Sequence, residues 1–61
     1  MPDTVDPREV AFALHCGDWM TVTVDGHGAG WTITAVYGRA FRVYRDGVEM
    51  TVPHGDVRQD G

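Results

Sequence analysis

Residues 41–52 have the sequence FRVYRDGVEMTV, and this stretch decides the fold. Asp46-Gly47 lies between two runs of alternating apolar and polar side chains, which is typical of a two-residue type I′ β-hairpin. The turn fixes a register with the pairs Arg45–Val48, Tyr44–Glu49, Val43–Met50, Arg42–Thr51 and Phe41–Val52. Side chains alternate across a sheet. We therefore predict one buried set, Phe41, Val43, Met50 and Val52, and one exposed set, Arg42, Tyr44, Glu49 and Thr51.

Further strands are predicted on both sides of this hairpin. Residues 20–24 alternate apolar with polar side chains, as in a half-buried strand. A glycine-rich loop over residues 25–30 leads to a second strand, residues 31–37, in which we expect the core-facing side chains to be Trp31, Ile33, Ala35 and Tyr37. After the hairpin, Pro53 cannot donate a hydrogen bond in a ladder. We predict a 3₁₀ turn there, followed by a short last strand over residues 57–59.

The segment before these strands fits two patterns. Asp6-Pro7-Arg8-Glu9 is typical of a helix start, with a capping residue, proline in the first turn and a capping-box glutamate. On this pattern a helix covers residues 7–16, ends at Gly17, and follows a loose tail over residues 1–6. The alternation of Val10, Phe12, Leu14 and Cys16 also suits a strand. The capping residues favour the helix, and the strand stays open as the alternative.

Length and composition limit the classes of function. The 61 residues make one domain, which we place at residues 7–61, and so short a chain buries only about 60% of its unfolded surface. Little volume remains for a catalytic pocket, and we expect a protein that is not an enzyme and holds no cofactor. The formal net charge of −4 disfavours non-specific binding to nucleic acid. We expect no signal peptide and no membrane-spanning run, hence a cytoplasmic protein.

Two stretches carry a family resemblance. Gly17-Asp18-Trp19-Met20-Thr21-Val22 is similar to the Gly-Asp-x-Val-x-Val opening of KOW and Tudor-like barrels, and residues 41–47 with 51–57 are similar to their closing half. Over residues 17–59 the chain thus resembles the SH3-like barrels. The resemblance implies a mainly β, antiparallel barrel of four to five short strands after the N-terminal helix. Members bind nucleic acids, methylated or proline-rich peptides, or protein surfaces, so the fold alone does not select a ligand.

The first candidate site is a set of arginines around Tyr44. Arginines interleaved with an aromatic residue can hold phosphates and stack bases, and arginine and tyrosine are equally suited to a protein interface. In an acidic protein, the simpler alternative is that they solvate a strand. Trp19 is predicted to point outward, opposite to Met20, and to anchor a partner. The predicted partner-binding residues are Trp19, Arg39, Arg42, Tyr44, Arg45 and Arg58.

An aromatic cage for a methylated cation is a second candidate. Its rings would be Trp19, Trp31, Tyr37 and Phe41. A domain of this size needs most of these rings for its core. We therefore favour burial over a cage.

Metal binding and catalysis are weaker candidates still. The ligand types His15, Cys16, His27, His54 and Asp56 match no zinc spacing. Cys16 beside His15 could in principle supply a nucleophile and a base, but the aspartates fall at turns, where their side chains bond backbone amides. We predict no metal site and no catalytic residue.

From the sequence we expect a protein–protein interaction module, accessory or regulatory in a bacterium or phage. It would dock on a larger protein through the Arg42/Tyr44 face, Trp19 or the glycine-rich loop. The alternative is a nucleic-acid-binding barrel, with the arginines on phosphates and Tyr44 stacked on a base. Homodimerisation through an open sheet edge is a third alternative, because free edge amides invite pairing.

Overall fold

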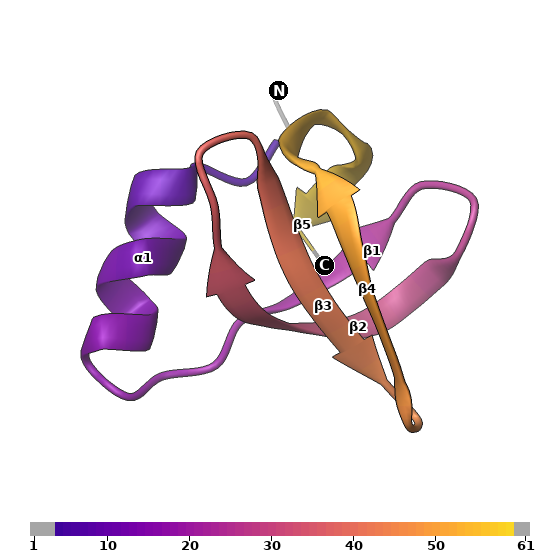
Figure 1. The fold of residues 1–61 in the computed structure, drawn as a ribbon, viewed down its shortest axis with the longest axis horizontal. Coiled ribbons are helices and arrows are strands. Elements are labelled where there is room, and N and C mark those ends of the chain that lie inside the picture. The colour runs from indigo at the N-terminus through magenta and orange to yellow at the C-terminus, as the bar shows by residue number, and fades with distance from the viewer. Residues whose placement is uncertain (1–3, 60–61) are drawn as a thin grey trace.

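One antiparallel sheet of five strands and one short helix make up the described part of the chain (Figure 1). The computed structural model describes residues 4–59. The strands lie in the order β4-β3-β2-β1-β5, so β4 and β5 are the two edges of an open sheet. The mainly β fold class predicted from the sequence is confirmed. The elements are α1 (Pro7–His15), β1 (Thr21–Val24), β2 (Gly28–Val36), β3 (Ala40–Arg45), β4 (Val48–Pro53), the 3₁₀ turn η1 (His54–Asp56) and β5 (Val57–Gln59).

The β3–β4 hairpin has the predicted register, from Arg45 opposite Val48 to Phe41 opposite Val52. Asp46 and Gly47 have φ of 51° and 83°, and a type I′ turn requires positive φ at both positions. Two of the predicted inner side chains, Phe41 and Val43, are fully buried, and Val52 is nearly so. Met50 is half-buried against the same core. The turn chemistry therefore sets which face of both strands is apolar.

The helix alternative is confirmed for the N-terminal segment, and the strand alternative is wrong. The Asp6 carboxylate accepts a hydrogen bond from the Arg8 N–H at 2.9 Å, and Pro7 occupies the first turn. That backbone hydrogen bond holds the pKa of Asp6 below its usual value. The helix ends at His15, one residue before the predicted end, because the chain turns through Gly17 at φ 84°.

The predicted loose tail is wrong in its described part. Val5 is 4% exposed and belongs to the core, and Thr4 forms an isolated bridge to Arg58 of β5. Val5, just before the helix cap, is apolar and is stabilised by burial in the core. Thr4 can pair because β5 is an edge strand. Residues 1–3 of that tail lie outside the described residues.

Strand β2 differs from its prediction at both ends. It starts at Gly28, because Gly28 pairs with Val24 of β1, and the predicted loop shrinks to the turn at residues 25–27. Further along, Ile33 pairs with Val43 but Ala35 pairs with Arg42, so Thr34 is the extra residue of a β-bulge. A bulge shifts the alternation by one position. Val36 consequently packs against the core and Tyr37 is 45% exposed, which corrects the predicted inward orientation of Tyr37.

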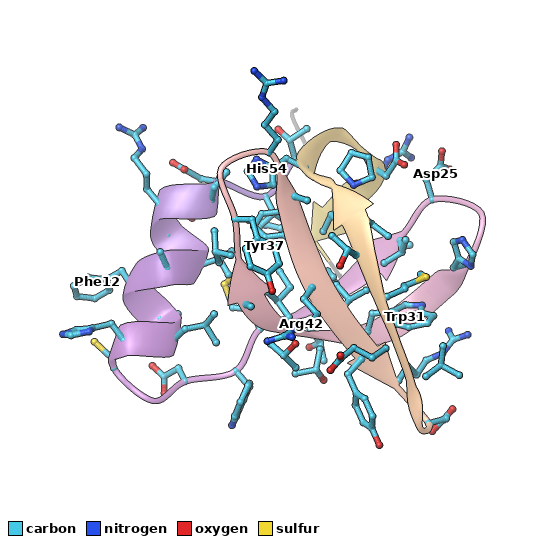
Figure 2. The ribbon with its side chains drawn as sticks, in the orientation of Figure 1. Phe12, Asp25, Trp31, Tyr37, Arg42 and His54 are labelled. Atoms are coloured by element: carbon cyan, nitrogen blue, oxygen red, sulfur yellow. The ribbon has the colours of Figure 1, made fainter. Side chains whose placement is uncertain are left out.

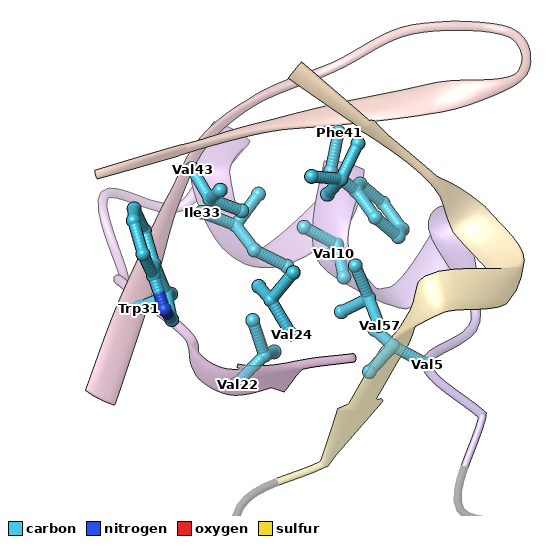
Figure 3. Close-up of a cluster of buried hydrophobic side chains, with 10 residues drawn as sticks. Val5, Val10, Val22, Val24, Trp31, Ile33, Phe41, Val43 and Val57 are labelled. Atoms are coloured by element: carbon cyan, nitrogen blue, oxygen red, sulfur yellow. The ribbon is translucent and has the colours of Figure 1, made fainter. Parts of the chain in front are cut away.

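The core lies inside the curve of the sheet, with α1 against it (Figure 3). The helix contributes Val10, which is fully buried, and Leu14, which is half-buried. No polar or charged residue among residues 4–59 is buried. The buried side chains are Val5, Val10, Val22, Val24, Trp31, Ile33, Phe41, Val43, Val52 and Val57. In the described part of the chain, no helix is long and apolar enough to cross a membrane.

Candidate binding surface

Three exposed aromatic rings lie on the outer face of the sheet. Tyr44 follows Arg42 on β3 with the same orientation, and Tyr37 points outward beyond the Thr34 bulge. The Ile33 N–H donates to the Met20 carbonyl at 2.9 Å, which extends the β1–β2 register by one residue. Because Met20 packs against the core, alternation turns Trp19 outward. Trp19 is 67% exposed, and Tyr37 and Tyr44 are each 45% exposed.

We call Trp19, Tyr37, Arg42 and Tyr44 the aromatic face. Trp19 precedes Met20, whose carbonyl bonds Ile33, and the next residue of β2, Thr34, donates its hydroxyl to the Arg42 carbonyl at 3.3 Å. Trp19, just before β1, and Arg42 of β3 therefore lie on either side of β2 on the same face of the sheet. Threonines fill the positions between the rings on β1 and β2. The result is a broad surface of aromatic rings and hydroxyl groups around one guanidinium.

Arg42 has hydrogen-bonding capacity left over on this surface. Its Nε is buried and has no hydrogen-bond partner within residues 4–59. Its Nη1 lies 3.9 Å from Glu49 Oε1, and the two side chains are 41% and 55% exposed. That separation is too long for a hydrogen bond, and an exposed ion pair of this kind contributes little. The terminal amino groups of this partly exposed side chain can therefore donate to a carboxylate or carbonyl that a partner brings.

Arg45 points to the other side of β3 and is held there. Its guanidinium carbon lies 4.5 Å from the centroid of the Trp31 ring, and its Nη1 donates to the Ala29 carbonyl at 2.8 Å. A side chain on Gly28, whose φ is 91°, would meet Arg45 Nη1 at 3.4 Å. The positive φ of Gly28 and Gly30, and not this contact, favours glycine at the start of β2. Arg45 is thus separated from the aromatic face.

The remaining predicted arginines are dispersed. Arg39 is exposed in the turn between β2 and β3, and Arg58 is exposed on β5, at the opposite edge of the sheet from β4. The fold therefore brings Trp19, Arg42 and Tyr44 together, but it does not gather Arg39, Arg45 and Arg58 beside them. A continuous cationic strip for a phosphate backbone does not form.

Truncation of Arg45 is expected to reduce stability because it removes the stacking on Trp31 and the bond to Ala29. We expect Arg45→Ala to lower the free energy of unfolding by about 1 kcal/mol, and Arg45→Lys to recover only part of this loss because an ammonium lacks the planar fork. Urea unfolding followed by tryptophan fluorescence measures both. Arg39→Ala, at an exposed turn position, is the control, and equal midpoints for Arg39→Ala and Arg45→Ala would contradict the assignment.

His54 holds the turn that carries Tyr37. Its Nε2 lies 3.0 Å from the carbonyl oxygens of both Tyr37 and Ala40. Because carbonyl oxygens only accept, Nε2 carries a hydrogen and donates to both. The imidazole also packs against the Phe41 ring at a tilt of 38°, with ring centroids 4.3 Å apart. This role of His54 is not predictable from the sequence, because the contact of η1 with residues 37–40 depends on the curvature of the sheet.

The remaining candidate chemistry is not assembled in the described part of the chain. No three histidine, cysteine, aspartate or glutamate side chains of residues 4–59 come close enough together to hold a metal ion. Their surface likewise has no pocket. The candidate aromatic cage does not form, because Trp31 and Phe41 are buried, as favoured above. Phe12 is 71% exposed but lies on the far side of α1 from the sheet (Figure 2), apart from the aromatic face.

The fold and this surface describe a small, mainly β protein that presents an aromatic–arginine face on an open sheet. Comparison of the chain with protein-family models, curated proteins and solved structures finds no match. Inferences about function therefore depend on the surface itself.

Proposed function

We propose that this protein is a non-enzymatic binding module that docks on a larger protein through the aromatic face. The exposure of Trp19, Tyr37 and Tyr44 on one side of the sheet carries the proposal. A domain of this size depends on every buried apolar group for its stability, so three large rings left in water indicate a second use. Tryptophan, tyrosine and arginine are also the residues most enriched among interface hot spots.

The shape of the surface favours a protein over a small molecule. Small ligands bind in concave sites that enclose most of their surface, whereas the outer face of a sheet offers a broad, open area. Five antiparallel strands with a 3₁₀ turn before the last one support the resemblance to SH3-like barrels, some of which bind protein surfaces. The dispersed arginines and the net charge of −4 weigh against the nucleic-acid alternative.

The proposal predicts that changes on the aromatic face abolish partner binding and leave the fold intact. We expect Arg42→Glu and Tyr44→Ala each to weaken capture of the partner from the source cell by more than about tenfold, as hot-spot residues do. Quantitative pull-down against wild type measures the loss, and circular dichroism confirms folding. The matched control is Arg58→Glu, which makes the same charge change at an exposed position on the opposite edge.

Two results would contradict the proposal. One is full capture by both Arg42→Glu and Tyr44→Ala, which would move the interface elsewhere. The other is tight binding of a mixed-sequence oligonucleotide that weakens log-linearly with salt, since that dependence is the signature of phosphate contacts. A protein interface built on aromatic hot spots is expected to depend less on salt.

A further inference from the structure

The free edge of β4 presents backbone groups at alternate residues. In a type I′ turn the N–H after the turn bonds the C=O before it, so Arg45 and Val48 form a hydrogen-bonded pair. Such pairs alternate with non-hydrogen-bonded pairs along an antiparallel ladder. Glu49 and Thr51 therefore direct their N–H and C=O groups away from β3. Within residues 4–59 no strand pairs with β4 on that side.

The length of this free edge is limited at both ends. Pro53 has the same phase as Glu49 and Thr51, but it has no N–H to donate. The Asp46-Gly47 turn closes the other end. The edge thus offers the donors and acceptors of two residues, enough for a short strand and too few for continued sheet growth.

The side chains around the edge give it a definite chemistry. On the inner side, Val48 is 54% exposed and Met50 is half-buried at the margin of the core. On the outer side, Glu49 is exposed, and the exposed carboxylates of Asp46 and Asp56 lie in the turn before β4 and in η1 after it. Glu49 and, in the adjoining turn, Asp46 therefore give the edge two carboxylates, with Arg42 as the neighbouring cation.

We propose that the edge of β4 binds an extended segment of a partner protein as an added strand, with basic side chains on the outer side and apolar side chains on the inner side. Strand addition satisfies the free backbone groups, and the alternating side chains provide specificity. A basic residue opposite Glu49 forms a cross-strand ion pair, and an apolar residue opposite Met50 covers the exposed margin of the core. The edge adjoins the aromatic face, since Tyr44 pairs with Glu49 and Arg42 with Thr51, but this inference does not depend on the proposed function.

Charge selects such a segment over a second copy of this chain. Two β4 edges brought together would place Asp46 and Glu49 of both copies at one interface, and each copy carries a net charge of −4. Like charges at an interface are repelled. A basic strand gains attraction at the same positions.

The probe is the peptide acetyl-Val-Thr-Val-Lys-Val-Lys-amide. In antiparallel pairing its threonine lies opposite Thr51, its central valine opposite Met50 and its first lysine opposite Glu49. We expect amide NMR shifts on titration to concentrate in residues 46–52, and hydrogen exchange to slow at the amides of Glu49 and Thr51, which become hydrogen-bonded.

Two N-methylated peptides provide matched ligands. Methylation of the threonine and the first lysine removes the two N–H groups that face β4, and we expect affinity to fall by more than about tenfold. Methylation of the second and third valines of the peptide removes N–H groups that face solvent. We expect this peptide to bind with an affinity close to that of the parent. Equal affinity of the two methylated peptides would overturn the proposal.

Two variants of the protein test the same edge by changing β4 in place of the peptide. Thr51→Pro removes the edge N–H at a position where an edge strand tolerates proline, and Thr51→Val changes the side chain and keeps the N–H. We expect the first to abolish peptide binding and the second to retain it. If Thr51→Pro does not fold, as judged by its NMR spectrum, the two methylated peptides decide the question.

Other results would also overturn the proposal. Binding of the peptide by folded Thr51→Pro at wild-type affinity would do so, and concentration-dependent dimerisation of the chain alone, lost in Thr51→Pro, would assign the edge to a second copy. Both leave the proposed function standing, because Thr51→Pro removes a backbone N–H of β4 and leaves the aromatic-face side chains Trp19, Arg42 and Tyr44 in place. Conversely, loss of the peptide in Thr51→Pro with full partner capture by both Arg42→Glu and Tyr44→Ala would reject the aromatic face and keep the edge.

Discussion

Phe41→Ala is expected to leave the protein largely unfolded at room temperature. The Phe41 ring is fully buried and packs against His54, which ties η1 to the turn between β2 and β3. Removing a buried phenylalanine side chain costs about 3–5 kcal/mol. A core in a chain of this length supplies about the same amount of net stability, so the loss removes the margin by which the folded state is favoured.

Circular dichroism and urea unfolding of Phe41→Ala test this expectation. Two controls separate the loss of core volume from a general effect on β3. Phe41→Leu keeps most of the apolar volume, and we expect a cooperative transition at a lower urea midpoint. Tyr44→Ala, on the outer face of the same strand, is expected to change the midpoint much less. A cooperative Phe41→Ala protein with a midpoint near that of wild type would show that the core is not organised around this ring.

The second large effect is expected for Val10→Glu. Val10 is the fully buried residue of α1, and it joins the helix to the core. Glutamate is a good helix former, so the substitution leaves helix propensity intact and places a carboxylate in an apolar site. Burying an unpaired charge costs several kcal/mol. We expect α1 to detach from the sheet and the whole domain to lose cooperative unfolding.

Phe12→Glu is the matched control on the same helix, since Phe12 is 71% exposed. The two variants introduce the same side chain two residues apart, on opposite sides of α1. We expect Phe12→Glu to unfold cooperatively near the wild-type midpoint, as measured by thermal circular dichroism. Similar destabilisation of both variants would contradict the packing of α1 described above.

Local chemistry explains which parts of this fold are predictable from the sequence. Asp46-Gly47 determines a turn with positive φ at two positions, and the register of β3 and β4 follows from that turn alone. Asp6-Pro7 likewise marks a helix start through one side-chain hydrogen bond. Both signals act over a few residues. They therefore appear in the sequence before any tertiary contact is known.

The predictions from the sequence are wrong where contacts between distant strands determine the orientation of a side chain. The Thr34 bulge lets β2 bend over the curved core, so its position depends on tertiary packing and leaves no local signature in the sequence. The bulge reverses the predicted orientation of Tyr37. The aromatic face was accordingly predicted only in part, from Trp19, Arg42 and Tyr44. The sequence also predicts Arg45 as a partner-binding residue, but it faces the start of β2, where it lies over Trp31 and donates to Ala29, sixteen residues earlier in the sequence.

The bridge between Thr4 and Arg58 has a consequence for protein engineering. It brings the first and last parts of the described chain to about 5 Å from each other, as in any antiparallel pair. A unit whose entry and exit points are adjacent can be spliced into a surface loop of a host protein without pulling the host's flanking residues apart. The same adjacency permits circular permutation, with the old ends joined by a short linker and new ends opened at the exposed turn over residues 25–27.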